Sequence, residues 1–186
     1  IALKTPLRQL RAQWVGSDTI SLAIAPSGLA EGFLFLFSRA SGTLTKIASG
    51  FGLETRWSPD GSLALISSTA YGGKNVRLSF RDRDGKELWS PGITTLTDKC
   101  FFASADKIYC AIPRFIPPEA VWPDDYLRGA LHTADLIALL DTSKKEVREV
   151  FTEGTFDITD LLLTKNEDYL FFVNRRDGTL WRYKLK

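Results

Sequence analysis

A four-residue turn signal, S-P-D-G at residues 58–61, directly follows Trp57 and precedes a run rich in apolar residues. Proline sets the backbone for the first corner of such a turn, and glycine supplies the positive φ angle that closes it. A weaker form of the pattern, an aromatic or aliphatic residue followed by a turn aspartate and a β-rich run, recurs along the chain. The four turn aspartates are Asp18, Asp60, Asp106 and Asp168. The chain is therefore built from a repeated unit of short antiparallel strands.

The spacing of these aspartates predicts the fold class. The first two intervals lie in or beside the window of roughly 40–50 residues that one four-stranded propeller blade requires, and the third unit carries an insertion. We therefore predict an all-β fold, a β-propeller of four-stranded antiparallel blades, with about four blades in this chain. The predicted blades span residues 7–49, 50–92, 93–154 and 155–186, with the insertion at residues 113–134. One short helical turn is expected near Asp124–Arg128.

The two ends of the chain bear on how such a ring would close. The last predicted blade has three strands, and a propeller closes when one terminus completes the blade begun by the other. Residues 1–7 would supply the missing strand of a closed four-bladed ring. We favour the alternative, in which further blades precede Ile1 and the chain is the C-terminal part of a larger ring. The lack of any methionine, including at position 1, motivates this expectation.

Composition excludes some classes of partner. The 186 residues are 44% hydrophobic and 25% charged, with a formal net charge of +2. Basic residues are scattered rather than gathered into the stripe that nucleic-acid binders present, so we expect no nucleic-acid partner. No apolar run approaches the roughly 20 residues of a membrane span, so a membrane anchor would have to lie upstream.

Residues 57–65, W-S-P-D-G-S-L-A-L, resemble the repeat of TolB-type and WD-repeat-like β-propellers. In those proteins, the turn joins the first two strands of a blade. The full motif occurs in the second predicted blade, and the other blades match it by the position of the turn aspartate. The resemblance implies the propeller fold, which hosts many unrelated functions.

The motifs that carry catalysis are not found in the sequence. The single histidine, His132, lies in the insertion, and there is no G-x-S-x-G elbow, H-E-x-x-H zinc motif or phosphate-binding glycine loop. The acidic segments at residues 82–85 and 177–181 fit hairpin turns better than a calcium loop or a sialidase-type Asp-box. We therefore expect no catalytic residue, no metal site and no cofactor within these residues.

The two cysteines, Cys100 and Cys110, are placed symmetrically about Ala105, the centre of a predicted hairpin turn. Residues equidistant from such a turn face each other across the two strands, at about the separation that a disulfide needs. The alternative is a pair of buried apolar thiols on one face of the blade. A disulfide would indicate an oxidising location, the periplasm or cell surface.

The insertion is the predicted binding region, because loops on a rigid scaffold commonly carry ligand sites. Its mixture of aromatic and charged residues suits a protein or glycan contact. The residues expected to contact a partner are Arg114, Phe115, Trp122, Asp124, Asp125, Tyr126, Arg128 and His132. The alternative is an ordered flap whose Trp122, Tyr126 and Leu127 plug the blade beneath them.

A second group of residues is assigned a structural role, because its members lie in turns or in strands that should pack between neighbouring blades. They are Trp14, Trp57, Asp60, Gly61, Trp89 and Trp181.

Taken together, these features predict a non-catalytic propeller that binds or scaffolds a protein or peptide partner through the insertion-bearing face. One alternative is a propeller domain that gates substrate access in a larger peptidase or hydrolase. Another is a glycan-binding propeller.

Overall fold

The computed structural model describes residues 7–185 of the chain. These residues form strands joined by short turns, with one 3₁₀ turn and one short helix. The strands are β1 (Leu10–Val15), β2 (Thr19–Ile24), β3 (Glu31–Ser38), β4 (Leu44–Trp57), β5 (Ala64–Ala70), β6 (Lys74–Arg81), β7 (Glu87–Trp89), β8 (Cys100–Phe102), β9 (Lys107–Pro113), β10 (Asp135–Asp141), β11 (Glu146–Phe151), β12 (Ile158–Leu163), β13 (Tyr169–Asn174) and β14 (Thr179–Lys184). The 3₁₀ turn η1 spans Thr97–Lys99, and the helix α1 spans Asp124–Leu127, where a helical turn was predicted.

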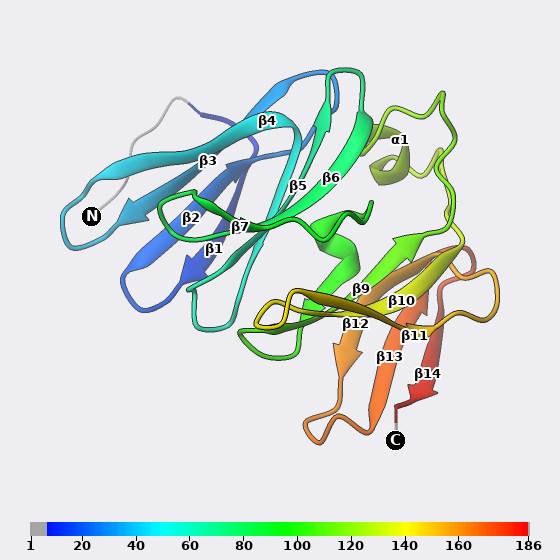
Figure 1. The fold of residues 1–186 in the computed structure, drawn as a ribbon. Coiled ribbons are helices and arrows are strands. Elements are labelled where there is room, and N and C mark those ends of the chain that lie inside the picture. The colour runs from blue at the N-terminus through cyan, green and yellow to red at the C-terminus, as the bar shows by residue number, and fades with distance from the viewer. Residues whose placement is uncertain (1–6, 186) are drawn as a thin grey trace.

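The strands pair into three antiparallel sheets (Figure 1). Strands β1 to β7 follow one another in the first sheet, at the upper left of the figure. The second sheet has the order β11-β10-β9-β8, and the third has the order β12-β13-β14. All pairs between neighbours are antiparallel, as the repeated turn signals predict. The fold is the expected all-β propeller, with its blades in sequence order.

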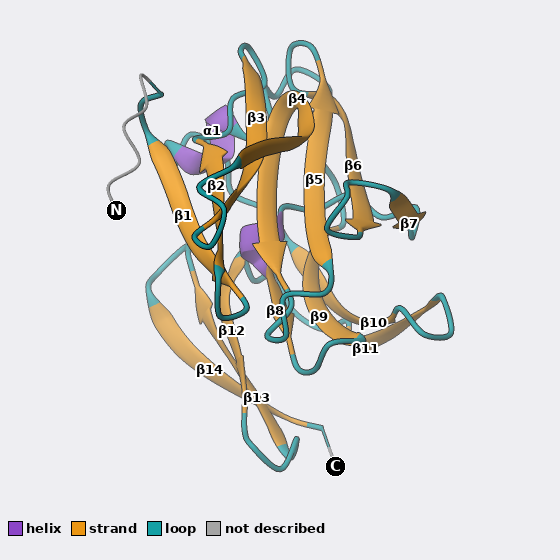
Figure 2. Cartoon of the chain, turned by 90° about the vertical axis from the view of Figure 1, so that its left-hand side faces the viewer, coloured by secondary structure: helices purple, strands orange, loops and turns teal. Residues whose placement is uncertain are grey.

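The seven-stranded sheet consists of two blades that share strand β4. Residues 44–51 of β4 pair with β3, and residues 51–57 pair with β5. Figure 2 shows β4 between these two partners. The predicted boundary between the first two blades falls at residues 49 and 50, so a break between strands is expected here. The structure instead bends one strand, and the positive φ of 57° at Gly52 fits that bend.

The core lies between the blades, where alternate residues of each strand face opposite neighbours. In β9, Ile108 and Cys110 pack toward the second blade, while Tyr109 and Ala111 pack toward the fourth. Both faces of an inner blade are therefore buried. Strand β5 is buried on both faces in the same way, because its consecutive residues 64–66 are all apolar and nearly inaccessible to solvent.

The turn at residues 58–61 is closed by side-chain hydrogen bonds. The Ser58 hydroxyl donates to Asp60 Oδ1 over 2.6 Å, and the Ser62 hydroxyl donates to Asp60 Oδ2 over 2.8 Å. These bonds lower the pKa of the Asp60 carboxyl. Gly61 has a φ of 68°, and a Cβ there would lie 2.8 Å from the backbone nitrogen of Gly16. A glycine is therefore required at this corner.

The four tryptophans assigned a structural role lie in different surroundings. Trp57 is 2% exposed and belongs to the core between the first two blades. Trp89 stacks on Phe80 with 5.3 Å between ring centroids. Trp14 departs from the expectation of a buried residue because it is 56% exposed. Its neighbour Val15 takes the core position, and adjacent residues of a strand face opposite sides.

Trp181, the fourth of these tryptophans, also departs from the expectation of a buried residue, because it is 44% exposed. Its ring contacts that of Phe156, with 4.7 Å between centroids, and its indole nitrogen donates to the Thr179 hydroxyl over 2.7 Å. Asp177 accepts bonds from the backbone and hydroxyl of Thr179. This segment is the hairpin turn that the sequence favours.

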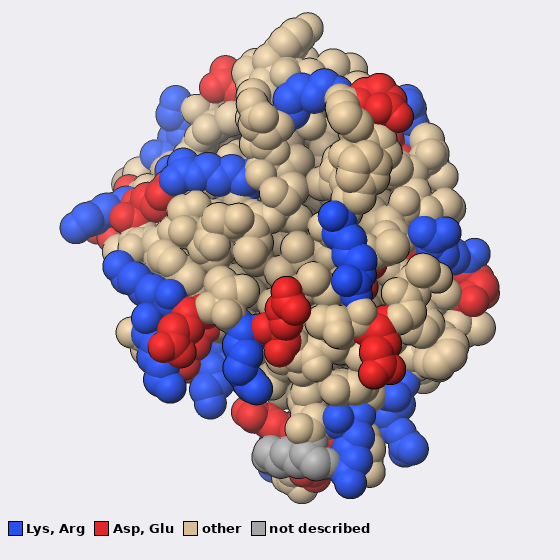
Figure 3. Space-filling view, turned by 45° about the vertical axis from the view of Figure 1, so that its right-hand side comes forward, with Lys and Arg blue, Asp and Glu red and all other residues tan. Residues whose placement is uncertain are grey.

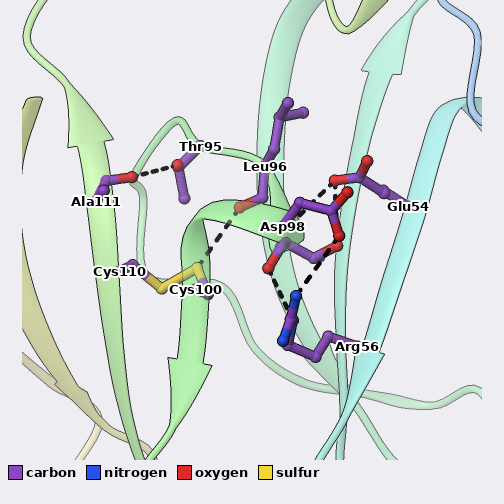
Figure 4. The surroundings of a disulfide bond; sticks show 9 residues. Glu54, Arg56, Thr95, Leu96, Asp98, Cys100, Cys110 and Ala111 are labelled. Carbon is purple, nitrogen blue, oxygen red and sulfur yellow. Dashed lines mark hydrogen bonds and ion pairs between the residues drawn. A yellow bond between two sulfur atoms is a disulfide. The ribbon is translucent and has the colours of Figure 1, made fainter. Parts of the chain in front are cut away.

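Cys100 and Cys110 face each other across β8 and β9 and form a disulfide (Figure 4). Both residues are buried in the core between the second and third blades. Of the two alternatives that the sequence left open, a disulfide and a pair of buried thiols, the structure has the disulfide. Among the helices of residues 7–185, none is long and apolar enough to cross a membrane.

Candidate functional site

A cavity of about 620 Å³ lies where the insertion meets the innermost strands of the second, third and fourth blades. Its walls come from the end of β4, from η1, from α1, and from β12 and β13. The lining residues are Arg56, Asp98, Lys99, Tyr126, Leu127, Thr159, Asp160, Val173, Arg175 and Gly178. Most of these side chains are polar, and Leu127 and Val173 add an apolar portion.

A second hollow of about 250 Å³ adjoins this cavity and extends it toward the first blade. The two share Arg56 and Asp98, and the second adds Arg11 and Gln13 from β1. On the face drawn in Figure 3, basic and acidic side chains are interspersed, and neither sign dominates.

Asp98 joins the charged side chains of three blades beside η1. Its carboxylate lies 3.3 Å from Arg11 Nη1 and 3.6 Å from Arg56 Nη2. Arg56 also donates from Nε to the carbonyl oxygen of Thr97 over 3.1 Å. Figure 4 shows Arg56, Asp98 and Glu54 gathered beside this helical turn, across from the disulfide. The arrangement holds two guanidinium groups at the wall of the cavity.

Glu54 is a buried carboxyl on the same stretch of β4. It accepts hydrogen bonds from the Thr97 hydroxyl over 3.2 Å and from the backbone nitrogen of Asp98 over 3.3 Å. Burial and the nearby charge of Asp98 raise its pKa to about 7, although Arg11 acts in the opposite direction. Glu54 therefore changes its charge near neutral pH.

Lys99 is fully buried at the junction of the insertion with the third and fourth blades. Its Nζ lies 2.8 Å from Asp135 Oδ2 and 3.0 Å from Asp157 Oδ1. It also donates to the hydroxyls of Tyr126, over 2.9 Å, and Thr133, over 3.1 Å. We call these five residues the Lys99 cluster. A buried charge requires this degree of pairing, because removing it from water costs several kcal/mol.

The pKa values in the Lys99 cluster reflect this pairing. For Asp157, burial would raise the pKa, but the charge of Lys99 and hydrogen bonds from Lys99, Tyr126 and His132 lower it to about 2. Burial raises the pKa of Tyr126, and Asp157 adds to that effect. His132 Nδ1 lies 3.0 Å from Asp157 Oδ2, with the imidazole 43% exposed. The insertion is thereby attached to the first residues of the fourth blade.

Two of the three aromatic residues predicted to contact a partner, Trp122 and Tyr126, are instead part of the core. Trp122 is 0% exposed and Tyr126 is 4% exposed, and their rings pack with 5.1 Å between centroids. Asp124 accepts hydrogen bonds from the Ser27 hydroxyl, over 2.8 Å, and the Gly28 backbone, over 2.6 Å. The burial of Trp122 and Tyr126 contradicts a surface role for these two residues and agrees with the ordered flap of the alternative interpretation, whereas Leu127, the third residue of that flap, is 37% exposed.

The remaining predicted contact residues lie nearer the surface. Phe115 is exposed, and Arg114 donates to the carbonyl oxygen of Thr152. Arg128 forms an ion pair with Asp125 within the insertion. These surface residues and the partly exposed His132 do not line one common pocket with Trp122 and Tyr126.

Several residues of the cavity were missed by the sequence analysis. They are Arg56, Asp98, Lys99, Asp160 and Arg175. A weak signal exists for Arg56, because Glu54 and Arg56 are two residues apart and therefore lie on the same face of β4. Among the residues the structure describes, no group of three or more His, Cys, Asp or Glu could hold a metal.

Comparison of the chain with known proteins gives matches in structure but not in sequence. No protein-family model and no curated protein matches it. The crystal structure of the tricorn protease superposes with a TM-score of 0.61 at 13% identity, covering 90% of this chain and 15% of that one. TolB from Acinetobacter baumannii gives a TM-score of 0.54 at 16% identity, with 90% and 38% covered.

The β-propeller domain of the trilobed protease from Pyrococcus furiosus gives a TM-score of 0.55 at 14% identity, with 91% and 51% covered. This chain thus spans at most about half the length of these three. At such identities the likeness concerns the fold alone. The chain has the β-propeller fold, of the kind found in TolB and in the tricorn and trilobed proteases.

Proposed function

We propose that this chain is a non-catalytic binding module that holds part of a partner protein in the cavity at the insertion-bearing face. The observation that carries the proposal is the cavity of about 620 Å³, whose wall includes Tyr126 and Leu127 of the insertion. Polar side chains placed on rigid strands can fix the orientation of a ligand. The partner would contact the cavity wall rather than Trp122, which is buried.

The contacts of His132 and Lys99 support a binding function rather than a catalytic one. His132 is engaged by Asp157, and Lys99 is enclosed by carboxylates and hydroxyls. Both serve to fix the insertion against the fourth blade. A rigid wall of this kind lowers the cost of ordering side chains when a partner binds.

A photo-crosslinking experiment tests the proposal. A photoreactive residue is placed at Leu127, on the cavity wall, or at Leu44, at the start of β4 on the opposite face. Leu44 is a matched control for Leu127, because the two side chains are 38% and 37% exposed. We expect one discrete crosslinked protein from position 127 and not from position 44, in cells that produce the full protein. Equal crosslinking from both positions, or none from position 127, would contradict the proposal.

A second candidate is a propeller domain that gates substrate access in a larger peptidase or hydrolase. It is favoured by the likeness to the tricorn and trilobed proteases, whose names record that activity. The intact mass of the natural gene product and its turnover of unfolded protein substrates separate the two candidates. A mass far above 20.8 kDa together with peptide release would favour the hydrolase.

We also propose a location outside the cytoplasm. The support is the buried Cys100–Cys110 disulfide, because such bonds persist mainly in oxidising compartments. Because both cysteines are buried, cells are lysed directly into denaturant with the alkylating agent and without reductant, and both cysteines should stay unlabelled. Labelling of both cysteines would argue for a reducing location.

A further inference from the structure

Strand β12, the innermost strand of the fourth blade, has a bulge at the wall of the cavity. Its pairing with β13 shifts register between Thr159 and Leu162, and Asp160 lies within the bulge with a φ of 51°. This left-handed conformation is unfavourable for most residues, although aspartate and asparagine tolerate it best. Bulges turn a side chain away from the regular alternation of a strand. Asp160 is exposed and lines the cavity.

Two of the three basic residues lining the cavity are already paired with carboxylates. Arg56 lies 3.6 Å from Asp98. Lys99 is enclosed between Asp135 and Asp157 and has no solvent exposure at its side chain. Each of these two residues therefore already has a carboxylate partner.

The third basic residue, Arg175, is bound to the insertion. Its Nη1 donates to the carbonyl oxygen of Tyr126 over 2.6 Å, and its Nη2 donates to that of Leu127 over 3.4 Å. The guanidinium also lies 4.3 Å from the centroid of the Tyr126 ring. These contacts hold it at the end of α1.

Asp160 differs from the other carboxylates of this region. Its Oδ2 accepts a hydrogen bond from the Thr159 hydroxyl over 3.2 Å. Within residues 7–185, no basic side chain forms an ion pair with it, whereas Asp98, Asp135 and Asp157 are all paired. The cavity therefore has an acceptor group left available for a ligand.

We propose that Asp160 anchors an ammonium or guanidinium group of the ligand, so that the cavity selects a lysine- or arginine-bearing segment of the partner. This inference rests on the proposed function and names the chemical class of its ligand. Charge-assisted hydrogen bonds to a carboxylate are among the stronger polar contacts available to a ligand. The apolar part of the cavity, Leu127 and Val173, suits the methylene stem of such a side chain.

An anionic ligand is disfavoured by the same contacts. It would compete with Asp98 for Arg56 and with the carbonyl oxygens of Tyr126 and Leu127 for Arg175. It would also face the unpaired charge of Asp160. Specificity arises from such repulsive elements as well as from attractive ones.

Binding of short peptides, followed by NMR of the isotope-labelled protein, tests the inference. The probes are capped pentapeptides of alanine with a central lysine, norleucine or glutamate. We expect the lysine peptide to shift the amide signals around residues 159–161 and 175, with an affinity roughly tenfold above that of the norleucine peptide. Asp160→Asn should remove this preference while keeping the bulge, because asparagine also tolerates a left-handed backbone. Glu149→Gln, an exposed change on β11, is the matched control.

Equal binding of the lysine and norleucine peptides, or retention of the preference in Asp160→Asn, would overturn the inference. So would the absence of any shift around the cavity with the lysine peptide. These failures are distinguishable from failure of the proposed function, because crosslinking from position 127 does not depend on the charge of the ligand. A discrete crosslink without lysine preference would keep the binding module and remove Asp160 as its anchor.

Discussion

The junction between the first two blades and the junction around Lys99 hold the chain together in different ways. The first is an apolar core of Val15, Leu34, Leu53, Trp57 and Ile66, with each side chain contributed by a regular strand. The second, the Lys99 cluster, joins the insertion to the third and fourth blades through charges and hydroxyls that are fully buried. The stability of the first junction depends on the apolar area removed from water, and that of the second depends on each buried charge having an oppositely charged or hydrogen-bonding partner.

The difference concerns how each junction responds to a single change. An apolar core loses contacts in proportion to the volume removed. A buried charge network loses more than the deleted group, because the remaining charges have no counter-ion and no access to water. Replacement of one residue in each junction measures this contrast directly.

The largest effect is expected for Lys99→Met. The change leaves Asp135 and Asp157 buried without their common counter-ion. Breaking one buried pair costs about 3–5 kcal/mol, and two carboxylates are affected here, so we expect a loss near 5 kcal/mol in the free energy of unfolding. Urea unfolding followed by tryptophan fluorescence gives the value.

A double variant keeps this test informative even if Lys99→Met does not fold. Lys99→Met with Asp157→Asn removes one of the two uncompensated charges and retains an acceptor for the Tyr126 and Thr133 hydroxyls. It should recover a substantial part of the lost stability. A double variant no more stable than the single one would show that charge imbalance is not the cause.

The next effect is that of Trp57→Ala in the apolar junction. Trp57 is 2% exposed, and removal of a buried aromatic side chain costs about 3–5 kcal/mol. Trp14→Ala is the natural control, because Trp14 is 56% exposed on the adjoining strand β1. Thermal unfolding should show a much lower Tm for the first variant and little change for the second. Equal shifts would mean that the two tryptophans contribute alike.

The two junctions also differ in how far the sequence predicts them. Alternation and turn residues locate the strands and their order, because each strand repeats a local rule along its length. The Cys100–Cys110 pairing follows from the same local symmetry about a hairpin. The predicted blade boundary at residues 49 and 50 instead falls inside the bent strand β4, because a glycine within a strand also resembles a strand break.

The irregular segments follow no such rule. Nothing local to the insertion states which of its aromatic residues face inward, so Trp122 and Tyr126 were expected to contact a partner. Lys99 finds its carboxylate Asp157 58 residues away in sequence, in another blade. Asp160 is directed into the cavity by a bulge, which shifts the period of two on which strand predictions rest. The site therefore depends on contacts that only the folded chain brings together.

Glu54 is a third case, a buried carboxyl whose charge is only partly balanced by its basic neighbour Arg11. Its pKa is raised from 4.5 to about 7 in the folded protein by burial and by Asp98. The folded state therefore holds a proton that the unfolded state releases between about pH 4.5 and pH 7. In this window stability falls as the pH rises, by an amount on the order of 3 kcal/mol, and the loss stays constant above about pH 7.

Replacement of Glu54 by glutamine removes this titration and keeps a side-chain oxygen for the hydrogen bonds from Thr97 and Asp98. The natural protein loses no stability from this titration below about pH 4, because Glu54 is then mostly protonated in both the folded and the unfolded state, so the variant and the natural protein should have similar stability there. Near pH 8 the variant should be more stable, because the buried charge is absent. Urea unfolding across this range measures the difference, with the exposed Glu146→Gln as control. Parallel pH profiles for Glu54→Gln and the natural protein would mean that Arg11 compensates Glu54 as fully as the carboxylates compensate Lys99.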